Sequence, residues 1–319
     1  MTTPRKQQIC LEATPYYHCM SRCVRRSYLC GQDPLTGKSY EHRKGWIEER
    51  IHALAAIYCI DILAYAVMSN HYHLVVRIDK HSAEQLTDWE VVERWSQLHS
   101  LPLLIEKWRL HLLDDQSETL LCQQIIDTWR QRLCDLSWFI KELNHSVSIQ
   151  ANREDQCSGR FWEGRYKSQA LLDEKALLTA MAYVDLNPVR ANVANTPEKS
   201  NFTSIKRRLT SIKKPSIVSR LALFSDSNDD GAIPFQFTEY LVLLDWLGRQ
   251  VREDKKGHIP QDLPPILARL NLSPEQCCHL CLSLGHQPRL WIGVKQSIER
   301  AKTILNKLRM RGFVIESAV

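Results

Sequence analysis

The chain has 319 residues, a net charge of +6 at pH 7 and 44% hydrophobic residues, so it is long enough for a sizeable core and for two domains. No apolar run reaches membrane-spanning length and residues 1–6 lack the apolar core of a signal peptide, so we expect a cytoplasmic protein with no membrane partner. The eleven cysteines form an odd, irregularly spaced set, which argues against a disulfide framework. The charge permits an anionic partner without proving one.

The first part of the chain predicts the order strand, helix, strand, strand. Residues 13 to 24 are rich in aromatic and small apolar side chains, which favours a strand running into a basic turn. Between Arg43 and Cys59 the apolar residues recur at helical spacing, so we expect an amphipathic helix there. Residues 60 to 68 predict a second strand, which turns at Ser69 and Asn70 into a third strand that ends near Asp79.

Helical spacing dominates from residue 82 to residue 150. We interpret residues 133 to 150 as the second helix of a split βαβ, or ferredoxin-like, arrangement, and residues 82 to 130 as a helical insertion. A basic loop with aromatic residues then leads into a fourth strand, and a helix follows from its N-cap, Asp173, to Asn187. The predicted fold class is therefore α+β, with a ferredoxin-like core whose antiparallel sheet carries helices on one face.

Beyond Pro188 the chain becomes polar, and we expect a linker at residues 196 to 236. Residues 237 to 319 predict a C-terminal all-helical domain with a basic last helix, which is either a DNA-binding helix-turn-helix relative or an accessory bundle with solvated charges. The cysteines and histidine at 277–281, with His286, form either zinc ligands or part of a helical core. We favour the core because no second paired half follows at the usual separation.

His71 and His73 stand two residues apart on the third strand, so both side chains point to one face of the sheet. They form either a structural pair or half of a metal site. The best source of the other half is the helix that ends at Pro188, where Tyr183 and Asn187 lie one turn apart. Imidazole and carboxamide ligands suit Mg²⁺ or Mn²⁺, and a phenol beside such an ion could attack phosphorus. His18 is expected to be structural, because a lone strand histidine is more often structural than a ligand.

Three motifs carry a resemblance to a known family: HYH at 71–73, GRYKS at 164–168 and YVDLNPVR at 183–190. On these motifs residues 10 to 195 resemble the single-strand DNA transposases of the HUH class, most closely the REP-associated tyrosine transposases. We therefore expect a catalytic domain at residues 1 to 195.

The resemblance implies that His71 and His73 bind a divalent metal, Mg²⁺ or Mn²⁺, that Asn187 completes the site and that Tyr183 is the nucleophile. It implies a metal-dependent endonuclease and strand transferase that forms a 5′-phosphotyrosine link to single-stranded DNA beside a hairpin. Such a protein acts as a monomer or a homodimer and is nucleoid-associated when it is bound to DNA. A replication or mobilisation nickase with the same nucleophile, and a regulator that binds DNA without cleaving it, stay open as alternatives.

DNA contacts are expected where positive charge and flat rings coincide, because cations neutralise phosphates and rings stack on unpaired bases. The candidates are Arg22, Arg25, Arg26, Arg160, Phe161, Trp162, Arg165, Tyr166, Lys167 and Arg190. The competing interpretation for these positions is a solvated basic loop with aromatic residues in the core.

Overall fold

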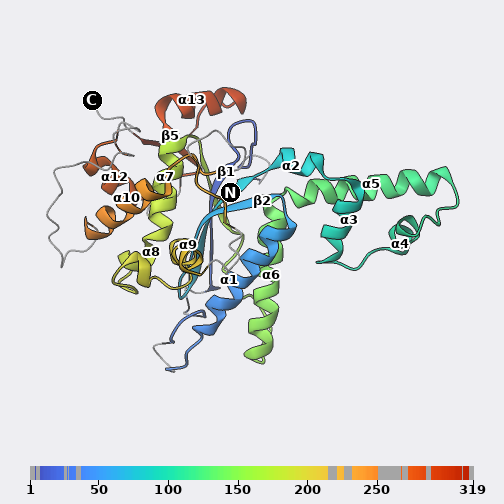
Figure 1. The fold of residues 1–319 in the computed structure, drawn as a ribbon, viewed down its shortest axis with the longest axis horizontal. Helices are drawn as coiled ribbons and strands as arrows, with labels where there is room; N and C mark the ends of the chain where they lie inside the picture. Colours follow the sequence, from blue (N-terminus) through green and yellow to red (C-terminus); the bar gives the residue numbers. More distant parts are fainter. Residues whose placement is uncertain are drawn as a thin grey trace.

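A sheet of six strands, in the order β2-β3-β1-β4-β5-β6, organises the part of the chain that the computed structural model describes (Figure 1). The described residues are 4, 8–24, 27, 29–33, 37–214, 221–225, 232–250, 267, 272–284, 289–310 and 312–315. Neighbouring strands from β2 to β4 are antiparallel, whereas β5 and β6 add in parallel beyond β4. The strands are β1 (Tyr16–Arg22), β2 (Ile60–Val67), β3 (His71–Ile78), β4 (Lys167–Leu171), β5 (Trp291–Val294) and β6 (Gly312–Ile315). The α+β class predicted from the sequence is confirmed.

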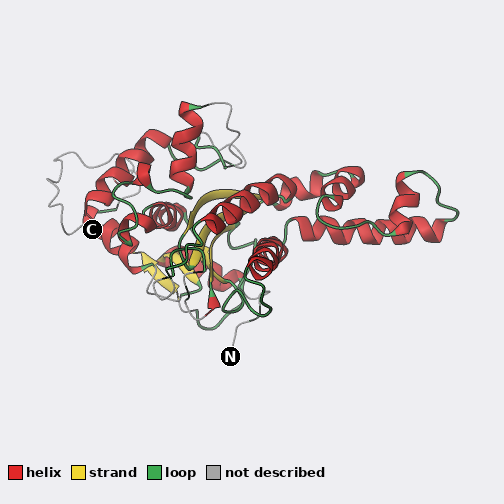
Figure 2. Cartoon of the chain, turned by 90° about the horizontal axis from the view of Figure 1, so that it is seen from below, coloured by secondary structure: helices red, strands yellow, loops and turns green. Residues whose placement is uncertain are grey.

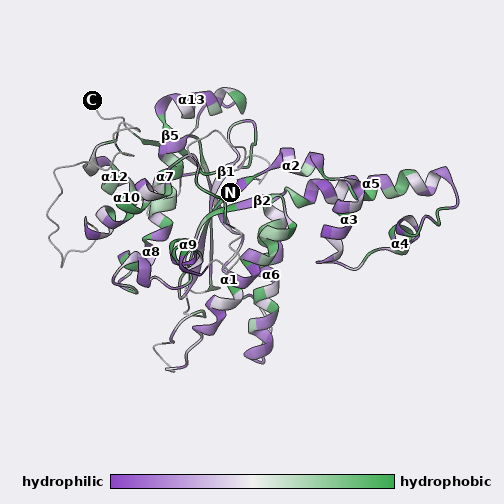
Figure 3. Ribbon diagram, viewed as in Figure 1, coloured by the Kyte–Doolittle hydropathy of each residue, from purple (hydrophilic) through white to green (hydrophobic). Residues whose placement is uncertain are grey.

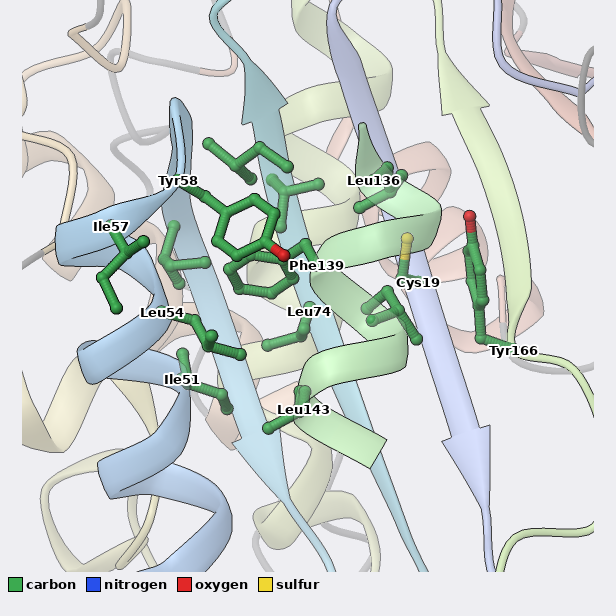
Figure 4. Packing of buried hydrophobic residues seen from close by; sticks show 14 of the residues in the cluster. Cys19, Ile51, Leu54, Ile57, Tyr58, Leu74, Leu136, Phe139, Leu143 and Tyr166 are labelled. Carbon is green, nitrogen blue, oxygen red and sulfur yellow. The ribbon is translucent and has the colours of Figure 1, made fainter. Parts of the chain in front are cut away.

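One face of the sheet is covered by two long helices, α1 (His42–Ile57) and α6 (Leu136–Glu154). Figure 4 shows apolar side chains of both helices, among them Leu54 and Phe139, packed over Leu74 of β3. Burial of these side chains removes apolar surface from water, which is the dominant stabilising contribution to such a layer.

The other face of the sheet is covered by α7 (Glu174–Asp185), which packs on β2, β3 and β4. The prediction of helices on one face is therefore wrong: α7 is buried along most of its length because the sheet lies on one side of it and α10 (Phe237–Gln250) and α12 (Pro274–Ser283) contribute to the same core. The predicted N-cap is confirmed, since the Asp173 carboxylate accepts a hydrogen bond from the amide of Ala176.

Four helices between β3 and α6 lie in the segment expected to be an insertion, and Figures 1 and 2 show that they project away from the sheet. They are α2 (Lys80–Gln85), α3 (Asp88–Ser96), α4 (Leu103–Arg109) and α5 (Gln116–Leu133). Polar and apolar residues are interspersed along these helices (Figure 3), and their apolar contacts include the stacked rings of Trp95 and Trp129. None of the described helices is long and apolar enough to cross a membrane.

The region after residue 190 is more closely joined to the sheet than the sequence predicted. The short helix α8 (Asn187–Arg190) precedes the segment expected as a linker at residues 196 to 236. That segment contains a 3₁₀ turn η3 (Pro197–Lys199) and α9 (Ser204–Lys213), which packs on β2. The prediction of an all-helical C-terminal domain is wrong, because β5 and β6 extend the sheet and α13 (Lys295–Ile304) connects them. Strands of four residues are too short to show a period of two.

Candidate active site

The two histidines of the HYH motif lie on the face of the sheet that α7 covers. In the register of β1 and β3, Arg22 is opposite His71 and Met20 is opposite His73, so all four side chains share this face. The next same-face residue of β1 is His18, whose ring stacks on His73 with 5.1 Å between the ring centroids. The sheet therefore brings three imidazoles together, two from β3 and one from β1.

Each imidazole makes one or two defined hydrogen bonds. His18 Nε2 lies 3.0 Å from His73 Nδ1, and His18 Nδ1 lies 2.7 Å from Gln169 Oε1 of β4. His71 Nδ1 lies 2.6 Å from the side-chain oxygen of Asn70. The remaining nitrogen of His73, Nε2, is buried and has no hydrogen-bond partner among the described atoms.

Burial keeps these imidazoles neutral. It lowers the pKa of His18 and the pKa of His71 to about 4, and Arg22 adds to the effect on His71. Burial also lowers the pKa of His73 well below its usual value, with further contributions from the neighbouring histidines and arginines. Neutral imidazole is the form that binds a metal ion.

Tyr183 of α7 packs against the same histidines. Its ring centroid lies 5.3 Å from that of His73 and 5.8 Å from that of His18, both in edge-to-face geometry. The guanidinium carbon of Arg190 lies 4.8 Å from the centre of the tyrosine ring. Burial raises the pKa of Tyr183, and the positive charge of Arg190 and hydrogen bonds from Asn187 and Arg190 only partly oppose this, so the phenol carries its proton at neutral pH.

Metal binding was predicted at His71, His73 and Asn187. Among the described residues no group of three or more His, Cys, Asp or Glu side chains is arranged to hold a metal ion. A pair of imidazoles with an amide is a different donor set, and the buried, unpartnered Nε2 of His73 fits a role as one of its ligands. The side chain of Asn187 lies beside the phenol, where its hydrogen bond lowers the pKa of Tyr183.

The helix carrying Tyr183 ends earlier than the sequence predicted. α7 stops at Asp185, and Asn187 begins the short helix α8, in which Pro188 occupies the first turn. Proline has no amide hydrogen and tolerates this position, so it starts the new helix instead of terminating the old one. Tyr183 and Asn187 nevertheless remain in contact across the break.

The cysteine cluster is part of the core in the described residues. Cys277 and Cys281 are buried against α7, and the thiol of Cys281 approaches the carbonyl of Thr179. His286 lies outside the described residues.

Positive side chains surround the tyrosine and histidines. Arg22 contributes its charge to the surroundings of His71, His73 and Tyr183, and exposed Lys167 is opposite Met20 on the same face of the sheet. Arg160 and Arg165 are exposed in the loop before β4, which runs beside the end of β1 through backbone hydrogen bonds. Arg25 and Arg26 lie outside the described residues.

The three aromatic candidates for base stacking are buried. Phe161, Trp162 and Tyr166 are 3%, 8% and 7% exposed and belong to the core beneath α6, on the face opposite the histidines. The Trp162 indole donates to the carbonyl of Asn144, and the Tyr166 hydroxyl is hydrogen-bonded to Ser137. Rings packed in this way offer no face to a base, so we leave them out of the proposed DNA contacts.

Gln169 is a site residue that the sequence analysis did not identify, and His18, which was expected to be structural, lies in the site beside His73. Their positions depend on β1 lying between β3 and β4, a long-range pairing that no local pattern encodes. The available signal was that His18 alternates in register with Met20 and Arg22, which is the spacing of residues on one sheet face.

Among known families, no family model matches the chain, and no curated protein matches it either. Among solved structures the chain is similar to a REP-associated tyrosine transposase bound to a REP hairpin, with a TM-score of 0.34 and 12% sequence identity. The match covers 68% of this chain and 89% of that chain. A similarity at this level places no residue of the site.

Proposed function

We propose that the protein is a metal-dependent endonuclease and strand transferase of the HUH class, which acts on single-stranded DNA beside a hairpin and has a ferredoxin-like catalytic core. One observation carries the proposal: the Tyr183 ring lies against the rings of His73 and His18 of the same chain, beside Arg190. A potential nucleophile, neutral metal-binding groups and a cation therefore converge from α7, α8 and the sheet. The order and antiparallel pairing of β1 to β4 support the core assignment.

The reaction exchanges one phosphodiester oxygen for another. The hydroxyl oxygen of Tyr183 attacks the phosphorus of a DNA phosphodiester and gives up its proton to solvent. The bond from phosphorus to the 3′ oxygen breaks, and that oxygen takes up a proton. The products are a 5′-phosphotyrosine link and a free 3′-hydroxyl, and attack by another 3′-hydroxyl on the link completes strand transfer.

The residues around Tyr183 assist this attack in two ways. Arg190 and Arg22 place positive charge where the phenol oxygen and the phosphoryl oxygens become more negative, which favours the transition state over the neutral phenol. Mg²⁺ or Mn²⁺, held by His71 and His73 with Asn187 as the proposed third ligand, would polarise a phosphoryl oxygen when bound. The raised pKa of Tyr183 indicates that the phenol needs such assistance at neutral pH.

The DNA strand is proposed to approach over the end of β1. Arg22, Lys167, Arg160 and Arg165 supply phosphate contacts along this edge, and their contribution weakens as salt concentration rises, because counterions compete for the phosphates. Arg25 and Arg26 continue the same basic segment in the sequence and stay proposed contacts.

A second candidate is a DNA-binding regulator that does not cleave. It is favoured by the burial of the reactive groups, since Tyr183 is 5% and His73 is 2% exposed. A phosphodiester reaches these groups only if side chains that bury them move, and the guanidinium of Arg190, 4.8 Å from the centre of the Tyr183 ring, is one that lies against them. If these side chains never move aside, the protein binds DNA through the basic residues at the end of β1 without cutting it.

A covalent-capture experiment separates the two candidates. The protein is mixed with a 5′-extended hairpin oligonucleotide and Mg²⁺ or Mn²⁺, and covalent product is resolved on a denaturing gel. We expect a slower protein–DNA band for the wild type and none for Tyr183→Phe. Tyr58→Phe is the matched control, because Tyr58 is a buried tyrosine on the other face of the sheet whose hydroxyl has no hydrogen-bond partner among the described atoms.

The outcomes are distinct. A covalent band that survives Tyr183→Phe rejects Tyr183 as the nucleophile. Hairpin binding by the wild type without any covalent band supports the regulator. The double variant His71→Ala and His73→Ala is expected to lose cleavage and keep most hairpin binding, and unchanged cleavage would remove the metal from the proposal.

A further inference from the structure

We propose that His18 and Gln169 act as positioning residues: they form a hydrogen-bonded relay that holds His73 in the tautomer whose Nε2 lone pair is free to bind a metal ion. The inference deepens the proposed function and depends on it, because it assigns a role toward the metal that His71 and His73 are proposed to hold. The relay runs through three strands, from His73 of β3 to His18 of β1 and Gln169 of β4.

A backbone carbonyl fixes the direction of the relay. The side-chain nitrogen of Gln169 lies 3.0 Å from the carbonyl oxygen of Arg289, and a carbonyl only accepts hydrogen bonds, so this end of the amide is the donor. The other end, Gln169 Oε1, is therefore the acceptor that faces His18 Nδ1 at 2.7 Å. The proton of His18 must lie on Nδ1.

The same argument gives the tautomer of His73, the residue proposed to bind the metal ion. A neutral His18 with its proton on Nδ1 has a lone pair on Nε2, which accepts from His73 Nδ1 at 3.0 Å. His73 then carries its proton on Nδ1 and a lone pair on Nε2. In the opposite tautomer His73 would bury an Nε2–H without an acceptor, because that atom has no hydrogen-bond partner among the described atoms.

His71 reaches the same tautomer through a different partner. Its Nδ1 donates to the side-chain oxygen of Asn70 at 2.6 Å, which leaves its lone pair on Nε2. The rings of His71 and His73 are nearly perpendicular, with centroids 4.8 Å apart. A shared metal ion needs one lone pair from each imidazole, and in this arrangement both rings offer it on Nε2. A hydrogen bond to the other ring nitrogen is how proteins usually set the tautomer of a metal-binding histidine.

The end of the relay belongs to the C-terminal part of the chain. Arg289 comes just before β5, and the amide of Ala170 in β4 donates to the carbonyl of Leu290 at 2.8 Å, which holds this segment beside Gln169. The C-terminal region therefore contributes a backbone atom to the organisation of the site, although its side chains are distant in sequence from the three motifs.

The tautomer can be measured without a metal or a substrate. We would label the metal-free protein with ¹⁵N-histidine, assign His71 and His73 from substitution spectra, and identify the protonated nitrogen of each ring by NMR at neutral pH. The expected result is a proton on Nδ1 of His73 in the wild type and in Gln169→Glu, whose carboxyl, neutral in this position, keeps an acceptor for His18 and a donor for the carbonyl of Arg289. In Gln169→Leu the acceptor is lost, and we expect His73 to show a mixture of tautomers.

Metal affinity gives a second readout. Mn²⁺ titration followed by electron paramagnetic resonance is expected to show binding about 10–100-fold weaker in Gln169→Leu than in the wild type, as for other residues that orient metal-binding histidines. Gln169→Glu is expected to bind close to the wild-type value. Thermal unfolding and metal-free hairpin binding check that both variants are folded.

The outcomes distinguish this inference from the proposed function. A proton on Nε2 of His73 in the wild type overturns the relay, whether or not the variants fold. Equal Mn²⁺ affinity in the wild type and a folded Gln169→Leu overturns it as well. If Mn²⁺ binding is the same in the wild type and in the double variant His71→Ala and His73→Ala, the metal site of the proposed function fails, while the NMR result still decides the tautomer.

Discussion

Asp185, two residues after Tyr183, is the residue whose replacement tests most directly what holds the tyrosine helix in place. Its carboxylate is 1% exposed and accepts three hydrogen bonds, from the Ser204 hydroxyl, from the Ile205 amide at 3.0 Å and from the Tyr240 hydroxyl at 2.7 Å. The donors belong to α9 and α10, so one carboxylate joins the end of α7 to two later helices.

The expected loss of stability follows from the hydrogen-bond donors that lose their acceptor when Asp185 is replaced. Asp185→Ala leaves three donors in the core without their acceptor, each at a cost of about 1–3 kcal/mol. Part of this is offset, because burial raises the pKa of Asp185 and so the charged carboxylate is itself costly to bury. We expect Asp185→Ala to lower the free energy of unfolding by about 3–5 kcal/mol, and Asp185→Asn, which keeps one oxygen, by about 1–2 kcal/mol.

Urea unfolding followed by circular dichroism measures both variants against the wild type, with the slope of the transition checked for a change in cooperativity. Tyr240→Phe is the matched control, because it removes one donor and leaves the carboxylate in place, and its expected cost is about 1 kcal/mol. A loss below about 1 kcal/mol for Asp185→Ala, or a larger loss for the asparagine than for the alanine variant, would refute the reasoning.

Two further predictions concern acid stability and strand packing. Burial, with a smaller effect of Arg207, holds the pKa of His52 at about 4, below its ordinary 6.5, so the stability it contributes is present above pH 6.5 and lost as the pH falls toward 4. Between about pH 7.5 and pH 5 we expect His52 to account for a loss of about 1 kcal/mol in the free energy of unfolding, a figure already reduced for its partial exposure. Urea unfolding of His52→Gln at the two pH values should not show this loss. A Cβ at Gly293 would lie 2.6 Å from the Asp173 carboxylate, so Gly293→Ala should cost about 1–3 kcal/mol, whereas Gly164→Ala, with open space around it, should be near neutral in the same assay.

Much of the fold up to residue 190 follows from local patterns. The helical spacing between Arg43 and Cys59 predicted α1, the alternation around His71 predicted β3, and Asp173 was recognised as the cap of α7. These features depend on residues near one another in the sequence, where a period of 3.6 or 2 reports which face is buried. The histidine pair was identified for the same reason.

The rest depends on long-range pairing that the sequence does not show locally. That α7 covers the histidine face, and that His18 and Gln169 meet across β1 and β4, requires the strand order of the sheet. The aromatic residues before β4 were expected beside the DNA, but Trp162 pairs with Cys23 in the backbone and so turns into the core beneath α6. A flat ring next to arginines is equally compatible in sequence with stacking on a base and with packing against a helix.

The predicted end of the catalytic domain at residue 195 separates residues that contact one another on the face of the sheet that α7 covers. The Asp173 carboxylate that caps α7 also accepts from the amide of Val294 in β5 at 2.7 Å, so the start of the tyrosine helix is joined to the C-terminal strands. Its other end is held through Asp185 by α9 and α10, and Gln169 reaches the carbonyl of Arg289. Because both ends of α7 and the histidine relay use atoms from described residues beyond residue 195, the geometry that brings Tyr183 to His73 depends on both sides of the expected boundary.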